Sequence, residues 1–219
     1  MPLELRQRFP VMALTQDGLA LDHVAQTEQL CAAGARWIQL RMKRAAPADW
    51  LATARAAVCL CREYGAICIV NDSVDIAVAS DADGVHLGKL NLGWPEARAR
   101  LGAERLLGGT VNDSADAARA RATGCLDYVG VGPLRFTATK KHLAPVLGLA
   151  GVRTLVAQLG DLPAWVIGGV TPDDLPALRA AGATGVAVSS ALYRDGRIAE
   201  NFRAFLSAWA PAAETISLP

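Results

Sequence analysis

The feature that most constrains this chain is a regular alternation of short apolar runs with longer amphipathic stretches. The runs are rich in Val, Ile and Leu, and the stretches between them are rich in Ala and Arg, which predicts buried strands joined by helices. The predicted strands are Phe9–Leu14, Trp37–Arg41, Ala66–Val70, Gly84–Leu87, Leu106–Thr110, Tyr128–Val131, Ala164–Ile167 and Gly185–Val188. The predicted helices are Leu21–Ala33, Pro47–Tyr64, Val74–Ala79, Pro95–Leu101, Ser114–Ala122, Leu149–Leu159, Pro172–Ala181 and Ile198–Trp209.

Repeated strand–helix units of this kind build a parallel sheet of the α/β class. The predicted units number eight, and no long linker or change in composition separates them. We therefore expect residues 1–219 to form a single domain, a (β/α)8 TIM barrel, with an open doubly wound sheet as the alternative. In a barrel, the functional residues stand at the carboxyl ends of the strands.

Composition narrows the class of partner. The net charge is +1, which argues against a surface built for nucleic acid, although a few focused cations would suffice for a small anionic substrate. The five cysteines include no CxxC pair and fit a reducing, cytoplasmic environment. We expect no signal peptide, and no segment approaches the roughly 18 apolar residues of a membrane helix. The oligomeric state stays open, a homo-oligomer included.

The strongest chemical signal follows the second predicted strand. Side chains alternate along a strand, so Gln39, Arg41 and Lys43 fall on one side of the chain. Two cations and an amide at a strand mouth suit a multiply charged anion such as a diphosphate. The alternative is a solvated strand end.

Polar and small residues follow the next strands as well. Asp72 could hold Mg²⁺, with Asn71 on the same phosphate, or it could cap the helix that follows. The fifth strand ends in Gly108-Gly109-Thr110, whose small residues permit close approach of a ligand to the backbone.

The last three strands add features suited to anions. The long loop after the sixth strand carries Thr137, Thr139, Lys140, Lys141 and His142, a candidate anion clamp and lid, or else a basic surface loop. The seventh strand leads into Gly168-Gly169 and the eighth into Ser189-Ser190. Such turns form the usual phosphate site of a barrel, with tight packing turns as the alternative.

Taken in order, QLRMK, NDSVDIA, ADGVHLG, GVGPLRFTATKK, IGGV and GVAVSSAL resemble the thiamine-phosphate synthase family. The resemblance extends from about Trp37 to Leu192 and is most specific in QLRMK and the TATKK loop. It implies a barrel transferase that joins a hydroxymethylpyrimidine diphosphate to a hydroxyethylthiazole phosphate, releasing diphosphate with the help of Mg²⁺.

The resemblance also implies roles for individual residues. The pyrimidine diphosphate would be held by Gln39, Arg41, Lys43, Asn71 and Lys140, of which Arg41, Lys43 and Lys140 would act on the leaving group. Thr110, where the family usually has Ser, would lie beside it. Thr137 and Thr139 would bind near the thiazole substrate and the diphosphate. The thiazole phosphate would be held by Gly168, Gly169, Ser189 and Ser190.

The chain departs from the family at the metal site. Asp72 and Asn91 would hold Mg²⁺, but Asn91 stands where the family has Asp, and Lys89 is close by. An amide oxygen binds this hard cation more weakly than a carboxylate, so we expect weakened Mg²⁺ binding, with Asp113 as a substitute ligand.

Two other functions stay open at this point. One is a thiazole tautomerase, a relative that needs a proton shuttle and no diphosphate clamp, supported by Asn91 and His142. The other is a non-catalytic homologue that binds a phosphorylated ligand. The synthase is favoured over both by the retained residues of the diphosphate clamp, namely Gln39, Arg41, Lys43, Thr137, Thr139 and Lys140.

Overall fold

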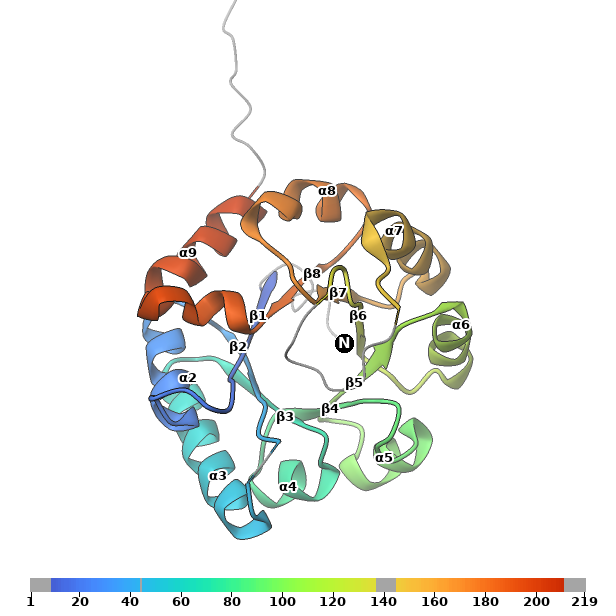
Figure 1. Cartoon of the computed structure of the whole chain (residues 1–219). Coiled ribbons are helices and arrows are strands. Elements are labelled where there is room, and N and C mark those ends of the chain that lie inside the picture. The colour runs from blue at the N-terminus through green and yellow to red at the C-terminus, as the bar shows by residue number, and fades with distance from the viewer. Residues whose placement is uncertain (1–8, 44, 137–144, 211–219) are drawn as a thin grey trace, which may run out of the picture.

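The computed structural model describes residues 9–43, 45–136 and 145–210. Eight parallel strands pair in chain order and close into a barrel, and helices surround it (Figure 1). Strand β8 pairs with β1, aligning Val11 with Val186, which closes the ring. The (β/α)8 prediction is confirmed, and the open-sheet alternative is wrong.

The strands are β1 (Val11–Leu14), β2 (Trp37–Leu40), β3 (Ile67–Asn71), β4 (Gly84–Leu87), β5 (Leu106–Val111), β6 (Tyr128–Val131), β7 (Ala164–Ile167) and β8 (Gly185–Val188). The helices are α2 (His23–Ala32), α3 (Pro47–Glu63), α4 (Val74–Ala79), α5 (Trp94–Leu101), α6 (Ser114–Thr123), α7 (Gly148–Leu159), α8 (Leu175–Ala180) and α9 (Ile198–Trp209). Two 3₁₀ segments complete the set, η1 (Pro172–Asp174) and η2 (Ser190–Gly196).

The predicted elements agree with these bounds to within two residues, apart from the start of α8. Strand β1 begins at Val11 and not at Phe9, because Pro10 has no amide hydrogen to donate to a ladder. The helix predicted from Pro172 begins instead as the 3₁₀ turn η1.

Alternation along each strand divides the core into two layers. In β1, Met12 and Leu14 belong to a cluster inside the barrel, while Val11 and Ala13 belong to the larger cluster between strands and helices. The period of two thus directs one set of side chains to the barrel axis and the other to the helices.

Three aromatic rings fill the barrel interior. Trp37 lies 4.7 Å from Trp165 and 5.1 Å from Tyr128 between ring centroids, and none of the three is exposed. Gly108 makes room for this packing, because a Cβ there would stand 2.2 Å from Cζ of Tyr128. The rings therefore fill part of the barrel axis.

None of the helices in the described part of the chain is long and apolar enough to cross a membrane. All five cysteines are free thiols.

Candidate active site

A pocket opens where the strands reach their carboxyl ends. Its lining includes residues that follow six of the strands within three positions: Lys43, Asp72, Gly88, Asn112, Gly168 and Ser189. Tyr128 and Trp165 line it from within the barrel. This is the end at which barrel enzymes carry their functional groups.

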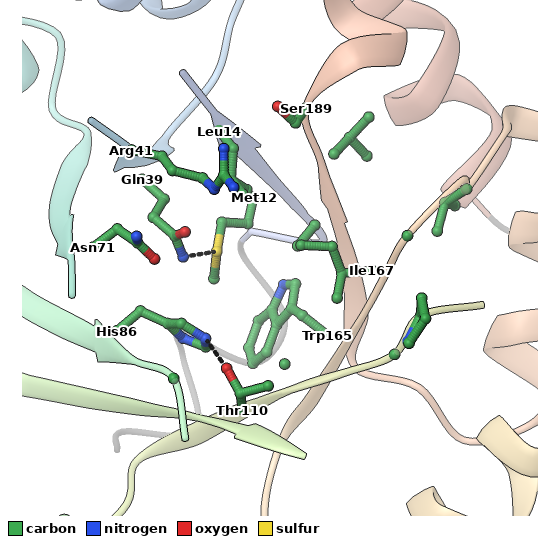
Figure 2. Close-up of a pocket in the computed structure, with 18 of the residues that line it drawn as sticks. Met12, Leu14, Gln39, Arg41, Asn71, His86, Thr110, Trp165, Ile167 and Ser189 are labelled. Atoms are coloured by element: carbon green, nitrogen blue, oxygen red, sulfur yellow. Dashed lines mark hydrogen bonds between the residues drawn. The ribbon is translucent and has the colours of Figure 1, made fainter. Parts of the chain in front are cut away.

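Three residues predicted to hold the diphosphate, Gln39, Arg41 and Lys43, all line this pocket and are called the clamp residues from here on. Gln39 and Arg41 lie on the same wall of the pocket as Asn71 in Figure 2, and Ser189 lies across from them. Gln39 is buried and donates from Nε2 to Sδ of Met12 at 3.3 Å. Sulfur is a weak acceptor, so this amide retains hydrogen-bonding capacity for a ligand.

Arg41 is a partly buried cation. Burial lowers the pKa of the Arg41 guanidinium, and the carboxylates of Asp72 and Asp17 act in the opposite direction. Arg41 remains charged even so, because a guanidinium group is not deprotonated in proteins. The described lining of the pocket therefore carries two cations, Arg41 and Lys43, and one carboxylate, Asp72.

Asp72 forms an ion pair with Lys43. Its backbone is in the left-handed region, with φ of 70°, and its amide donates to the carbonyl of His86 on β4 at 2.8 Å. Asp is among the non-glycine residues that accept this conformation. The alternative role as a helix cap is wrong, because the α4 cap is Ser73, whose Oγ accepts the amide of Ile76.

Asn71 and Thr110 complete this side of the pocket. Asn71 is 6% exposed, and its Nδ2 has no hydrogen-bond partner among the residues that the structure describes. Thr110 Oγ1 lies 3.1 Å from Nε2 of His86. A buried amide without a partner costs free energy, which a ligand with an acceptor atom would recover.

The opposite wall is formed by the turns after β7 and β8. Gly168 and Gly169 both have positive φ, 98° and 67°. Arg135, from the loop after β6, holds this wall together: it pairs with Asp174 at 2.5 Å and donates to the carbonyl of Gly169 at 3.1 Å. The Arg135 guanidinium in turn holds the pKa of Asp174 below its usual range.

Ser189 and Ser190 line the pocket on this wall, as expected. The hydroxyl of Ser189 is 3.4 Å from Oε1 of Gln16. Backbone amides beside two hydroxyls, with little side-chain bulk, are suited to a phosphate group.

Asn91 and Asp113 do not line the pocket. Oδ1 of Asn91 accepts the amide of Gly88 at 2.6 Å. Asp113 caps helix α6 and pairs with Lys89 at 3.1 Å. Both oxygen donors are thus engaged in holding turns, and no group of three or more His, Cys, Asp or Glu in the described ranges could hold a metal by itself.

Five residues of the predicted loop, Thr137, Thr139, Lys140, Lys141 and His142, lie outside the described residues. The other predicted substrate-binding residues come together in the one pocket: Gln39, Arg41, Lys43, Asn71, Thr110, Gly168, Gly169, Ser189 and Ser190.

Sequence reasoning assigned no role to several lining residues, namely Met12, His86, Asn112, Tyr128 and Trp165. A signal for some of them was present. Met12, His86, Tyr128 and Trp165 occupy alternate, inward positions of their strands, as Gln39 does. Assigning the side chains at these alternate positions to the barrel interior would have identified all four residues.

Comparison with known proteins agrees with the geometry. The sequence pattern of the family described as thiamine monophosphate synthase matches residues 11–192. A thiamine-phosphate synthase of Bacteroides fragilis is 44% identical over 163 residues, covering 73% of this chain and 79% of that protein. The corresponding protein of Laribacter hongkongensis is 44% identical over 166 residues, covering 76% and 77%.

Solved structures give the same result. A thiamine phosphate pyrophosphorylase of Pyrococcus furiosus superposes with a TM-score of 0.84 at 29% identity, covering 94% of this chain and 97% of that one. A 3-hexulose-6-phosphate synthase, at 18% identity and a TM-score of 0.63, shares the fold alone. With a family pattern that matches residues 11–192 and a relative that is 44% identical, the chain belongs to the thiamine monophosphate synthase family.

Proposed function

We propose that this protein is a thiamine-phosphate synthase, a transferase that couples hydroxymethylpyrimidine diphosphate with hydroxyethylthiazole phosphate. The observation that carries the proposal is a single pocket with a cationic wall on one side and a wall of glycine and serine turns on the other. Family membership supports the same reaction.

The cationic wall would hold the diphosphate. Arg41 and Lys43 would neutralise its charge, and Asn71, whose buried Nδ2 lacks a described partner, would donate to a phosphate oxygen. Lys43 pairs with Asp72, and a bound diphosphate would offer its ammonium a further acceptor. Lys140 is proposed as a third cation from the family resemblance.

The glycine and serine turns would hold the thiazole phosphate. Gly168, Gly169, Ser189 and Ser190 offer amides and hydroxyls without a nearby acidic side chain in the pocket lining. Thr137 and Thr139 are proposed to join them from the loop after β6. The two substrates would then face each other across the pocket.

Mg²⁺ is the proposed cofactor. Asp72 is the one carboxylate in the described lining of the pocket, which fits a cation that commonly uses one or two carboxylates together with substrate phosphate oxygens. Asn91 is the second proposed ligand, and its hydrogen bond to Gly88 would have to be given up or shared. When bound, Mg²⁺ would neutralise charge on the diphosphate.

The chemistry follows from charge. Departure of diphosphate becomes favourable when Arg41, Lys43 and Lys140 compensate the negative charge that grows on it. A methylene cation stabilised by the pyrimidine amine would remain, and the thiazole nitrogen held opposite would capture it. The chain's part is to bind, orient and neutralise, and the step requires no protein nucleophile.

The test is a coupling assay. Purified protein is mixed with both substrates and a Mg²⁺ titration, and thiamine phosphate is followed as fluorescent thiochrome, with Asn91→Asp as the paired variant. We expect product from both, and half-maximal rate at lower Mg²⁺ for Asn91→Asp. Binding without product would contradict the proposal, and isomerisation of a thiazole carboxylate phosphate in place of coupling would support the tautomerase.

A further inference from the structure

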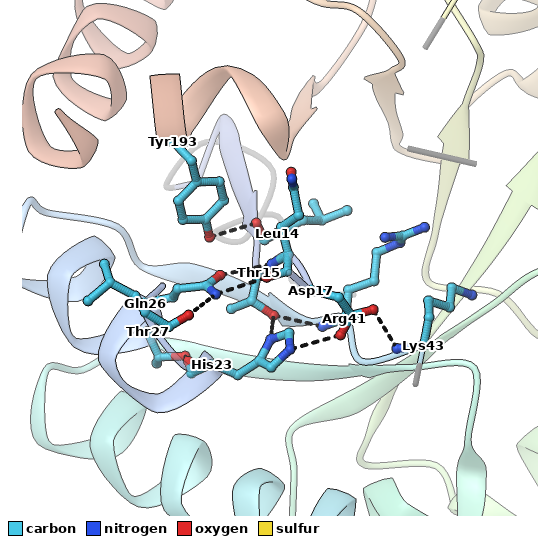
Figure 3. A network of polar contacts seen from close by, with 11 residues as sticks. Leu14, Thr15, Asp17, His23, Gln26, Thr27, Arg41, Lys43 and Tyr193 are labelled. Atoms are coloured by element: carbon cyan, nitrogen blue, oxygen red, sulfur yellow. Dashed lines mark hydrogen bonds and ion pairs between the residues drawn. The ribbon is translucent and has the colours of Figure 1, made fainter. Parts of the chain in front are cut away.

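A polar network lies directly behind the cationic wall. It joins the loop after β1 and the first turn of α2 to the backbone of the residues that follow β2 (Figure 3). The amide of Arg41 donates to Oγ1 of Thr15 at 2.9 Å, and the amide of Lys43 donates to Oδ2 of Asp17 at 3.0 Å. Both clamp cations are therefore held by their backbones.

These bonds continue the β1–β2 ladder past the end of the main-chain pairing. The amide of Thr15 donates to the carbonyl of Gln39 at 3.0 Å, the last backbone bond of the pair. Amides two residues apart on an extended strand point the same way, so those of residues 41 and 43 also face the β1 side. Side-chain oxygens take the place of carbonyls there, which keeps both cations on the pocket side.

The imidazole ring of His23 contacts both of these acceptor side chains, Thr15 and Asp17. His23 Nδ1 lies 2.8 Å from Oγ1 of Thr15, and Nε2 lies 3.0 Å from Oδ1 of Asp17. The neutral tautomer with hydrogen on Nε2 satisfies every group, since Nε2 donates to Asp17 while Nδ1 accepts the Thr15 hydroxyl hydrogen. Oγ1 of Thr15 is then left to accept from the amide of Arg41.

Helix α2 also contacts the loop after β1 through a second residue, Gln26. His23 is its first residue, after the Asp22 cap, and Gln26 lies on the same face one turn later. Gln26 accepts the amide of Gln16 at 2.8 Å and donates to its carbonyl at 2.9 Å. Helix α2 thus contacts the loop in two ways. Gln26 bonds to the loop backbone, and His23 bonds to the side chains of Thr15 and Asp17.

We propose that His23 is a positioning residue that fixes Arg41 and Lys43 for diphosphate binding, acting through Thr15 and Asp17. The inference rests on the proposed function, because it takes a diphosphate as the ligand of the clamp. His23, Thr15 and Asp17 do not line the pocket, so their effect on a ligand passes through the clamp backbone.

The test measures binding of inorganic diphosphate to the full chain by calorimetry, in buffer containing Mg²⁺. The variants are His23→Ala and Thr15→Val, the latter nearly isosteric, with Thr15→Ser restoring the hydroxyl. Thr27→Val is the matched control, because Thr27 is equally buried and its hydroxyl donates within α2, to the carbonyl of His23 at 2.8 Å.

Residues that orient metal ligands from outside the coordination shell change metal affinity about 10–100-fold when mutated. By the same reasoning, we expect the Kd for diphosphate to rise about tenfold in His23→Ala and in Thr15→Val. Thr15→Ser should restore binding, and Thr27→Val should leave it unchanged. In the coupling assay, Thr15→Val should raise KM for the pyrimidine diphosphate and leave KM for the thiazole phosphate within twofold, which a general loss of structure would not do.

The outcomes separate the two proposals. Wild-type binding with unchanged Kd in Thr15→Val and His23→Ala overturns the positioning role alone. Equal effects of Thr15→Val and Thr27→Val, or of Thr15→Val on both KM values, also overturn it by showing a structural role. A wild-type protein that does not bind diphosphate overturns the proposed function and the inference together.

Discussion

Gly168, in the turn after β7, should not tolerate even one added carbon. Its φ is 98°, and a Cβ built there would lie 2.7 Å from Cβ of Pro133 and 2.8 Å from its Cα. The Pro133 atoms cannot move aside as the end of a flexible side chain could. Gly168→Ala therefore combines backbone strain with a steric overlap in the turn that faces the proposed thiazole phosphate.

The two costs can be estimated separately. A left-handed backbone costs a residue with a Cβ about 1–2 kcal/mol, and an overpacked site costs about 1–3 kcal/mol. Gly168→Ala should thus lower the free energy of unfolding by about 2–5 kcal/mol. Gly124→Ala is the matched control, because Gly124 has φ of 59° at the end of α6 with nothing within 4 Å of its Cβ position. Gly124→Ala should lower the free energy of unfolding by only about 1–2 kcal/mol, the cost of the left-handed backbone conformation.

Urea denaturation of both variants measures the difference. We also expect Gly168→Ala to raise KM for the thiazole phosphate, since the turn must shift to admit the methyl group. Equal losses of stability for the two variants would refute the reasoning, because they would show that the contact with Pro133 imposes no requirement for glycine.

Three further predictions follow from the ion pairs and the buried hydroxyl. Arg135 lowers the pKa of Asp174 in the folded state, so this carboxylate stabilises the fold above the unfolded pKa of about 3.9, and the contribution is lost as pH falls through the lower folded value. Asp174→Asn should cost about 1–2 kcal/mol in urea titrations at pH 7, a deficit that shrinks at pH 3; a deficit independent of pH would contradict the pairing. Tyr128→Phe should change the free energy of unfolding by less than about 1 kcal/mol, because its buried hydroxyl has no partner among the described residues, and a larger loss would reveal one. Asp72→Asn, which tolerates positive φ and removes the partner of Lys43, should raise the Mg²⁺ needed for half-maximal coupling about tenfold or more, whereas an unchanged titration would remove Asp72 from the metal site.

The features that follow from local pattern were predictable. The alternation of side chains along β2 and the residues that follow it placed Gln39, Arg41 and Lys43 on one side of the chain, and all three line the pocket. The alternation of strands and helices likewise predicted the barrel, and the barrel predicted which strand ends would meet.

The features that depend on contacts distant in sequence were not predictable. Asp72 and Ser73 are both good helix caps, and the choice between them follows from the bond that the Asp72 amide donates to His86 on the next strand. Asp113 looked available to a metal until the structure paired it with Lys89, 24 positions away. Such pairings need the register of the strands, which one sequence does not provide.

The central claim is that the two walls of one pocket hold two different substrates. Its most direct test is the KM for each substrate in Arg41→Gln, on the cationic wall, and in Ser189→Ala, on the opposite wall. We predict that Arg41→Gln raises KM for the pyrimidine diphosphate alone and that Ser189→Ala raises KM for the thiazole phosphate alone. If each variant raised both values equally, the division of the pocket into two substrate sites would be wrong.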